Sequence, residues 1–131
     1  MHSLTIAELK KVIALQDLPE NHLQWIIDHS EYREYEDGAV VTKTGDPIDH
    51  MWFLIQGKGN FYLDVGGRLV HYYTFDNNKK TGGVGGLLPY SRMKAAPGFT
   101  FIVGKARILL LHKKYFKQLE QLNPALIQQL I

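Results

Sequence analysis

The sequence predicts a mainly β protein, an antiparallel β-roll of the jelly-roll (double-stranded β-helix) type, with short N-terminal helices and a C-terminal helical segment. Between residues 32 and 112, short runs of β-branched and aromatic residues alternate with glycine-containing turns. Residues with helical apolar spacing lie on both sides of this region. With 131 residues, 45% of them hydrophobic, the chain is long enough for one domain, 1–131, whose core needs no disulfide or metal.

Short helices are expected between residues 5 and 30. Thr5 and Glu8 have the spacing of a capping box, in which each side chain accepts from the other residue's backbone N–H. A second helix is expected to begin at about Asp17 to Pro19 and to end before Ser30, because proline favours the first turn of a helix. The apolar faces of these helices consist of Ile6, Leu9, Val12 and Ile13 and of Leu23, Ile26 and Ile27.

The strands of the roll are expected between residues 32 and 112. Turns are predicted at Asp37-Gly38, Gly45-Asp46 and Gly57-Lys58-Gly59, and Gly66-Gly67 separates two runs by only two residues, as a tight β-hairpin requires. Apolar and polar residues alternate before this hairpin, so one of its faces is expected to point to the core. The expected strands are 32–35, 39–43, 51–56, 59–65, 68–75, 99–103 and 106–112.

A stretch without strand character separates the fifth expected strand from the sixth. It begins with polar residues and a glycine run, which cannot pack a core. Residues 87–96 follow, and they are long enough for one short helical turn before Pro97-Gly98 ends it.

Two helices are expected at the C-terminal end, over about 113–131. The first covers about 113–122, and the second begins at Pro124 with Asn123 as its N-cap. The second helix has an apolar stripe that runs to the last residue without a stop signal. This stripe favours three interpretations: a longer helix in a larger protein, a homodimer contact, or packing back onto the roll. Its residues are Leu126, Ile127, Leu130 and Ile131.

Composition and charge restrict the function further. The chain has no Cys, no apolar run long enough to span a bilayer and no signal-peptide pattern at its start, which predicts a cytoplasmic protein without membrane contact. The net charge is only +2, but residues 1–76 carry 6 Lys/Arg and 12 Asp/Glu, whereas residues 77–131 carry 9 Lys/Arg and one acidic residue, Glu120. The basic half indicates either a solvated surface, an anion pocket or a docking surface for an acidic partner.

From about residue 9 to 131, the order of these elements resembles the cyclic nucleotide-binding domain. The most specific stretches are 38–46, which reads Gly-Ala-Val-Val-Thr-Lys-Thr-Gly-Asp, and 51–59, which reads Met-Trp-Phe-Leu-Ile-Gln-Gly-Lys-Gly and is similar to the family's hydrophobic strand and glycine turn. The family binds its ligand with a phosphate-binding cassette that reads Phe-Gly-Glu-Leu, a short helix, and Arg-(Ala/Thr)-Ala. In this chain the cassette region, 82–97, contains Val84-Gly85-Gly86-Leu87 and Lys94-Ala95-Ala96.

The resemblance implies an anion site in this cassette. Glycine-rich backbone N–H groups at a helix N-terminus, together with a basic side chain, are typical of phosphate binding. Gly85, Gly86 and Leu87 are expected to supply the N–H groups, and Lys94 or Arg92 the cation. Ser91 is expected to cap the cassette turn or to donate to the anion, and Ala95 completes the predicted site.

Two departures from the family pattern bear on the ligand. Gly86 stands where the family has the Glu that accepts from the ribose hydroxyl, and Lys94 stands where it has an Arg. A lysine cannot make the bidentate contact that an arginine makes with two phosphate oxygens. The expected ligand is therefore a cyclic nucleotide, cyclic AMP or cyclic GMP, bound weakly or not at all, or another phosphate-bearing small molecule.

The stretch 87–93, Leu-Leu-Pro-Tyr-Ser-Arg-Met, is similar to a divergent cassette in cyclic nucleotide-binding-like domains at the N-terminus of bacterial sensor histidine kinases. That similarity implies that the chain is part of a longer signalling protein, with the kinase as a fused output.

Other chemistries find no support in the sequence. Ser91 lacks the flanking glycines of a nucleophile elbow, and the six His form neither His-x-His nor His-Glu-x-x-His, so no catalytic or metal-ligating residue is predicted. No helix-turn-helix is recognisable, and the aromatic residues near Tyr72 do not interleave with Lys or Arg, so direct nucleic-acid binding is not expected.

The sequence thus predicts a non-catalytic regulatory domain that couples a small anionic ligand to a fused or partner signalling domain. Ligand binding is expected to shift the packing of the cassette and of the C-terminal helices. The alternatives are a ligand-free protein–protein interaction or dimerisation module, and the effector domain of a transcription regulator. The residues expected to carry the shift are Leu87, Leu88, Tyr115, Phe116 and Leu119.

Overall fold

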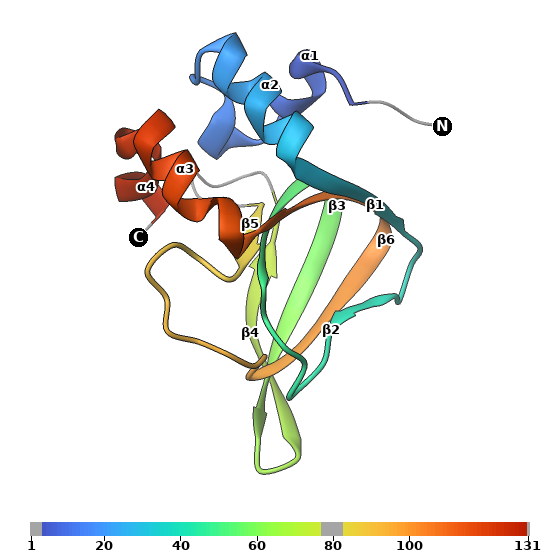
Figure 1. Cartoon of the computed structure of the whole chain (residues 1–131). Coiled ribbons are helices and arrows are strands. Elements are labelled where there is room, and N and C mark those ends of the chain that lie inside the picture. The colour runs from blue at the N-terminus through green and yellow to red at the C-terminus, as the bar shows by residue number, and fades with distance from the viewer. Residues whose placement is uncertain (1–3, 77–82, 131) are drawn as a thin grey trace.

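The computed structural model describes residues 4–76 and 83–130 of the chain. Helices gather at one end and the strands form a roll beneath them, from which one hairpin projects (Figure 1). This arrangement confirms the predicted β-roll with flanking helices. The elements are α1 (Ile6–Leu9), η1 (Ile13–Leu15), α2 (Glu20–His29), β1 (Ser30–Tyr35), β2 (Val40–Thr42), β3 (His50–Val65), β4 (Arg68–Phe75), β5 (Val84–Gly86), β6 (Gly98–His112), η2 (Lys113–Tyr115), α3 (Phe116–Leu122) and α4 (Pro124–Leu130).

The helix caps predicted from the sequence are formed. The Glu8 N–H donates to Thr5 Oγ1 at 3.2 Å, and the Thr5 N–H donates to Glu8 Oε1 at 3.3 Å, which is a complete capping box at the start of α1. At the other end of the chain, the Leu126 N–H donates to Asn123 Oδ1 at 3.0 Å, so Asn123 is the N-cap of α4. These contacts are local, because they join residues three positions apart.

All the strand pairs are antiparallel, in the order β1-β6-β3-β4, with β2 beside β6 and β5 beside β3. The two longest strands, β3 and β6, pair from His50↔His112 to Leu63↔Gly98, with register shifts near Gln56. Each of these strands unites two strands that the sequence predicted as separate. The shorter strands pair with these two: β1 and β2 pair with β6, and β4 and β5 pair with β3.

The predicted turn at 57–59 is wrong, because these residues lie within β3. Gly57 has a φ of +105°, and a Cβ at this position would lie 2.5 Å from the Lys105 carbonyl oxygen. Glycine is required here by the close approach of β6 and not by a chain reversal. By contrast, Gly66 and Gly67 have φ values of +62° and +88° and join β3 to β4 in the predicted tight hairpin.

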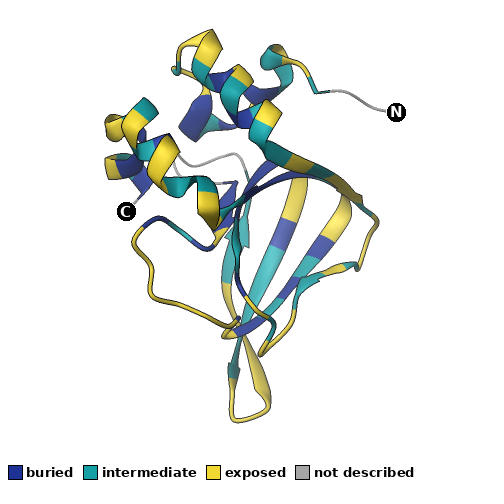
Figure 2. Cartoon of the chain, viewed as in Figure 1, coloured by how far each residue is buried: buried dark blue, intermediate teal, exposed yellow. Residues whose placement is uncertain are grey.

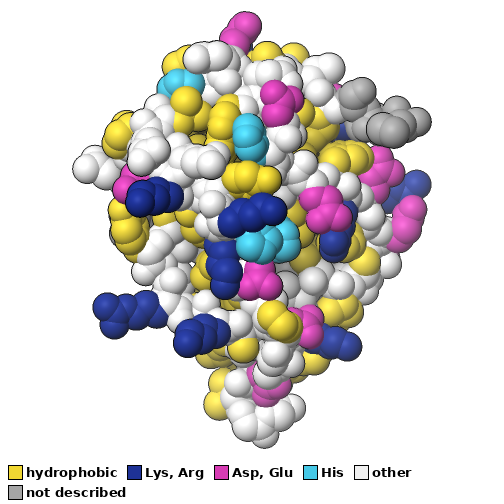
Figure 3. Space-filling view, in the orientation of Figure 1, with side chains coloured by type: hydrophobic (Ala, Val, Ile, Leu, Met, Phe, Trp, Pro, Cys, Tyr) yellow, Lys and Arg dark blue, Asp and Glu magenta, His cyan; other side chains and the backbone are white. Residues whose placement is uncertain are grey.

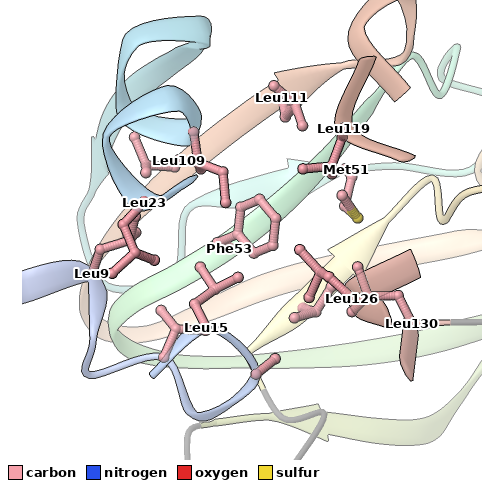
Figure 4. Packing of buried hydrophobic residues seen from close by; sticks show 14 of the residues in the cluster. Leu9, Leu15, Leu23, Met51, Phe53, Leu109, Leu111, Leu119, Leu126 and Leu130 are labelled. Atoms are coloured by element: carbon pink, nitrogen blue, oxygen red, sulfur yellow. The ribbon is translucent and has the colours of Figure 1, made fainter. Parts of the chain in front are cut away.

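Strand β3 is buried on both faces where it crosses the core. Met51 and Phe53 point to a cluster shared with the helices, whereas Trp52 and Leu54 belong to a second cluster inside the roll. Figure 4 shows the Phe53 ring at the centre of the first cluster, among leucines from the N- and C-terminal helices and from β6. The helices are thus attached to the roll through one continuous core, and Figure 2 shows their buried faces turned toward it.

The apolar stripe of α4 belongs to the same core. Leu126, Ile127 and Leu130 are buried there, so the stripe packs back onto the domain, as one of the three interpretations proposed. Ile131 lies outside the described residues. A homodimer through the C-terminal helix stays a prediction.

Within the described ranges, no helix is both long and apolar enough to cross a membrane.

Several basic residues of the C-terminal half form ion pairs with acidic residues of the N-terminal half. Arg107 Nη2 lies 2.6 Å from Glu8 Oε2, and both side chains are largely buried. Lys113 Nζ lies 3.2 Å from Asp49 Oδ1, at the end of β6. Part of the uneven charge along the sequence is therefore neutralised by the fold.

Candidate functional site

The segment 87–97 connects β5 to β6 and lies beside the roll as an extended loop (Figure 1). The helical turn predicted here is wrong. The Ser91 N–H donates to the Leu88 carbonyl oxygen at 3.1 Å, and Tyr90 has a φ of +67°. Pro89 disfavours helical backbone at Leu88, and a turn with proline second and a positive φ third is of type II.

The second half of this segment is held against the loop that precedes β3. The Ala96 N–H donates to the Asp46 carbonyl oxygen at 2.8 Å, and the Gly45 N–H donates to the Ala96 carbonyl oxygen at 2.9 Å. The Ile48 N–H donates to the Lys94 carbonyl oxygen at 3.1 Å. The segment is therefore anchored at this end, while its exposed middle lies farther from the roll (Figure 2).

A cavity of about 420 Å³ lies between the roll and this segment. The wall on the roll side comes mainly from β3 and β4, and the opposite wall from the segment. Of the residues that the structure describes, no Lys, Arg, Asp, Glu or His lines it. Its lining consists of Thr42, Ile48, Trp52, Phe61, Leu63, Tyr72, Phe75, Val84, Gly85, Gly86, Leu88, Met93, Ala96, Pro97 and Thr100.

Gly85 and Gly86 line the cavity, but their backbone lies against Trp52. A Cβ at Gly85 would lie 2.3 Å from the Trp52 ring, and a Cβ at Gly86 would lie 2.5 Å from the His50 carbonyl oxygen. The N–H of Leu87, predicted as an anion donor, instead donates to that same carbonyl oxygen at 2.8 Å. The glycine pair thus allows β5 to approach β3 and the Trp52 ring closely.

The other predicted site residues do not line the cavity. Ser91, Arg92, Lys94 and Ala95 are exposed, and Ser91 Oγ accepts from the Met93 N–H at 3.2 Å, a contact within the segment. The Arg92 and Lys94 side chains form no hydrogen bond or ion pair with any residue in the described part of the chain. In Figure 3, Lys and Arg side chains project freely on the side of the molecule where Figure 1 shows this segment.

Sequence reasoning missed most residues of the cavity. The inward-facing aromatic residues of β3 and β4 have the pattern of ordinary core residues, so nothing distinguished them as a ligand surface. A weak signal was present in the segment itself, where the lining residues Leu88, Met93, Ala96 and Pro97 are apolar although the segment was expected to bind an anion. Seven of the residues that line the cavity lie in the cassette region 82–97, and two of them, Gly85 and Gly86, are predicted site residues.

The segment also contacts helix α3 directly. The Tyr90 hydroxyl donates to the Glu120 carboxylate, and Leu87 forms a small buried cluster with Ile48 and Ala96, against which Phe116 packs. Leu88 packs on the main core, which includes Leu119 of α3. One wall of the cavity is thus connected to the C-terminal helices by both polar and apolar contacts.

Two histidines, His50 and His112, lie beside the start of the segment 87–97, where the Leu87 N–H donates to the His50 carbonyl oxygen. The rings of His50 and His112 are 4.9 Å apart between centroids, and burial, followed by the charge of His112, lowers the pKa of His50. In the ranges that the structure covers, no group of three or more His, Cys, Asp or Glu could hold a metal ion.

No protein-family model and no curated protein sequence matches this chain. Solved structures, however, resemble it closely in fold. The regulatory domain of protein kinase A from Toxoplasma gondii, crystallised with cAMP, has a TM-score of 0.74 and 17% identity, over 95% of this chain and 46% of that one. The sensor domain of the transcriptional regulator DNR from Pseudomonas aeruginosa has a TM-score of 0.73 and 16% identity, over 95% of this chain and 81% of that one.

The Catabolite Activator Protein of Thermus thermophilus has a TM-score of 0.71 and 16% identity, over 89% of this chain and 53% of that one. The chain thus spans about half the length of the kinase and activator structures. The three structures match the chain over almost all of its length. The chain therefore has the fold of the cyclic nucleotide-binding domains, the fold that its sequence resembles.

Proposed function

We propose that this chain is a non-catalytic sensor domain, in which a small molecule bound in the cavity changes the packing of the C-terminal helices. One observation carries the proposal: the segment 87–97 forms a wall of the cavity and contacts α3 at the same time. The names of two similar structures, a kinase regulatory domain and a sensor domain of a transcriptional regulator, support a regulatory role.

The coupling follows from the different contacts of neighbouring residues in the segment, some of which face the cavity and others α3. Leu88 and Met93 line the cavity, whereas Leu87 and Tyr90 contact α3. A bound molecule that displaces the first pair moves the second pair through the same short backbone. It shifts the equilibrium between two packings by the difference in its affinity for them.

The output is proposed to be a fused or partner signalling domain. The similarity of 87–93 to the sensors of bacterial histidine kinases favours a kinase. In either case α3 and α4 are the elements that transmit the change in packing, because they follow the cavity wall in the sequence.

Hydrogen exchange tests this coupling without knowledge of the ligand. Leu63→Trp fills part of the cavity, and we expect it to change the exchange rates of the α3 and α4 amides, because the segment must move outward. Val65→Trp is the matched control: Val65 lies two residues further along β3, is 56% exposed and does not line the cavity. The amides of β6 report any global loss of stability.

If both tryptophan variants leave α3 and α4 unchanged, the sensor proposal is wrong and a ligand-free interaction module becomes the better description. If both variants change α3 and α4 alike, the effect does not come from the cavity, and the proposal is equally contradicted.

A separate prediction concerns cyclic nucleotides. Calorimetric titration with cyclic AMP and cyclic GMP is expected to show no micromolar binding, because none of the described residues in the lining supplies a carboxylate for the ribose or a cation for the phosphate. Micromolar binding that disappears in the Arg92→Ala/Lys94→Ala double variant would instead establish the anion site that the sequence predicted. Circular dichroism of both proteins shows whether they are folded.

A further inference from the structure

We propose that the cavity binds an uncharged, flat aromatic molecule that carries one hydrogen-bond acceptor. This inference rests on the proposed function, because it names the class of ligand for the same cavity. It differs from the cyclic nucleotide or phosphate-bearing ligand that the sequence resemblance implies.

Aromatic side chains form much of the wall on the roll side. Trp52 and Phe75 meet edge to face with ring centroids 4.7 Å apart, and Phe61 and Tyr72 meet edge to face at 6.1 Å. These two pairs join β3 to β4, and all four residues line the cavity. Aromatic rings prefer such edge-to-face or offset contacts, so a flat ring system is the shape that this wall favours. The volume of about 420 Å³ is ordinary for a small-molecule site.

The lining excludes a charged ligand on energetic grounds. Moving an ionised group out of water without a partner costs far more than a neutral polar group does. No charged residue of the described chain lines the cavity, and the nearest basic residues of the segment, Arg92 and Lys94, are exposed to solvent. A phosphate in this cavity would lose its hydration and gain no ion pair from the described residues that line it. A neutral ligand pays no such penalty.

Two threonines place a buried hydroxyl pair in the lining of the cavity. Thr42 and Thr100 both line it, and their Oγ1 atoms are 3.1 Å apart, with Thr100 only 4% exposed. Each hydroxyl has one hydrogen to donate, and the contact between them uses only one. Within the described part of the chain no residue accepts the second hydrogen. The pair therefore offers one donor to an acceptor on the ligand, such as a carbonyl oxygen.

The opposite wall, formed by the segment 87–97, can adapt to apolar ligands of different shapes. Met93 lines the cavity from the exposed middle of the segment. Its unbranched, polarisable side chain adapts to irregular apolar shapes. Leu88, Ala96 and Pro97 complete an apolar wall without a further side-chain donor.

The experiment uses two fluorescent probes that share a dimethylaminonaphthalene ring system. Prodan is neutral and has one ketone, whereas dimethylaminonaphthalene sulfonate has an anionic sulfonate in place of the ketone. Titrated into the whole chain, prodan is expected to bind saturably at one site with a blue-shifted emission. The sulfonate is expected to bind at least tenfold more weakly. Equal affinities, or tighter binding of the sulfonate, would overturn the proposal.

Matched variants locate the bound probe. Leu63→Lys places a cation in the lining and is expected to weaken prodan binding at least tenfold, whereas Val65→Lys, on the same face of β3 but outside the cavity, leaves it unchanged. The Thr42→Val/Thr100→Val double variant keeps the shape and is expected to weaken prodan several-fold. If the two lysine variants bind prodan alike, the probe is not in the cavity and the assignment is wrong. If the double variant binds prodan as the wild type does, the predicted acceptor contact is wrong.

Failure of this inference and failure of the sensor proposal are distinguishable. Micromolar binding of a cyclic nucleotide by a protein that does not bind prodan would overturn the ligand class and leave the sensor role intact. Binding of prodan in the cavity without any change in the hydrogen exchange of α3 and α4 would support the ligand class and contradict the sensor role.

Discussion

Phe53→Ala is expected to lower the free energy of unfolding by about 3–5 kcal/mol, the range for truncation of a fully buried phenylalanine. Phe53 has an exposed fraction of 0% and lies at the centre of the cluster that joins the N-terminal helices, the C-terminal helices and the roll (Figure 4). Its removal leaves a cavity between the N-terminal helices, the C-terminal helices and the roll, and these three parts cannot all move inward to fill it. Urea unfolding followed by circular dichroism measures the effect.

Tyr72→Ala is the matched control for this prediction. Tyr72 is an aromatic residue of β4 with 70% of its surface exposed, so its truncation removes mainly its edge-to-face contact with Phe61 and is expected to lower the free energy of unfolding by only about 0.5–1.5 kcal/mol. A loss for Phe53→Ala that is no larger than the loss for Tyr72→Ala would show that the helices are not anchored through this cluster.

Gly57→Ala is expected to have the second largest effect. A φ of +105° is strained for alanine, which costs about 1–2 kcal/mol. In addition, the new Cβ would lie 2.5 Å from the Lys105 carbonyl oxygen and 2.8 Å from Ala106 Cα, so β6 must move away from β3. Overpacking of this kind costs about 1–3 kcal/mol more.

Gly104→Ala separates the two contributions. Gly104 also has a positive φ, +75°, but a Cβ there meets nothing within 4 Å, so only the conformational cost applies. The difference between the two variants in urea unfolding therefore measures the close approach of β6 to Gly57. Equal losses would mean that the backbone at Gly57 has room for a side chain, contrary to the structure.

The features that the sequence predicted correctly depend on neighbouring residues. The capping box of Thr5 and Glu8, the Asn123 cap and the Gly66-Gly67 hairpin all have their partners within a few positions. Gly57 was misinterpreted because its partner, Lys105, is distant in the sequence. A glycine that permits close approach and a glycine that reverses the chain look the same in a sequence.

The candidate site was predicted only in part, for a similar reason. The glycines of the cassette region were found, but their packing against Trp52 depends on the pairing of β5 with β3. The helical turn was predicted from the length and composition of 87–96, and the turn around Pro89 replaces it. Of the residues predicted from the family resemblance, Arg92 and Lys94 are therefore exposed, whereas the described residues that line the cavity carry no charge.

The pairing of β6 with both β1 and β3 has a consequence for the synthesis of this protein. Ser30 pairs with Leu111, and His50 pairs with His112, so neither pairing exists until the residues up to His112 are available. Such distant pairings give a high contact order and slow folding, on the millisecond to second scale. During translation β3 therefore emerges before its main partner β6, and its apolar residues stay uncovered by that partner until β6 is available, which favours aggregation at this stage.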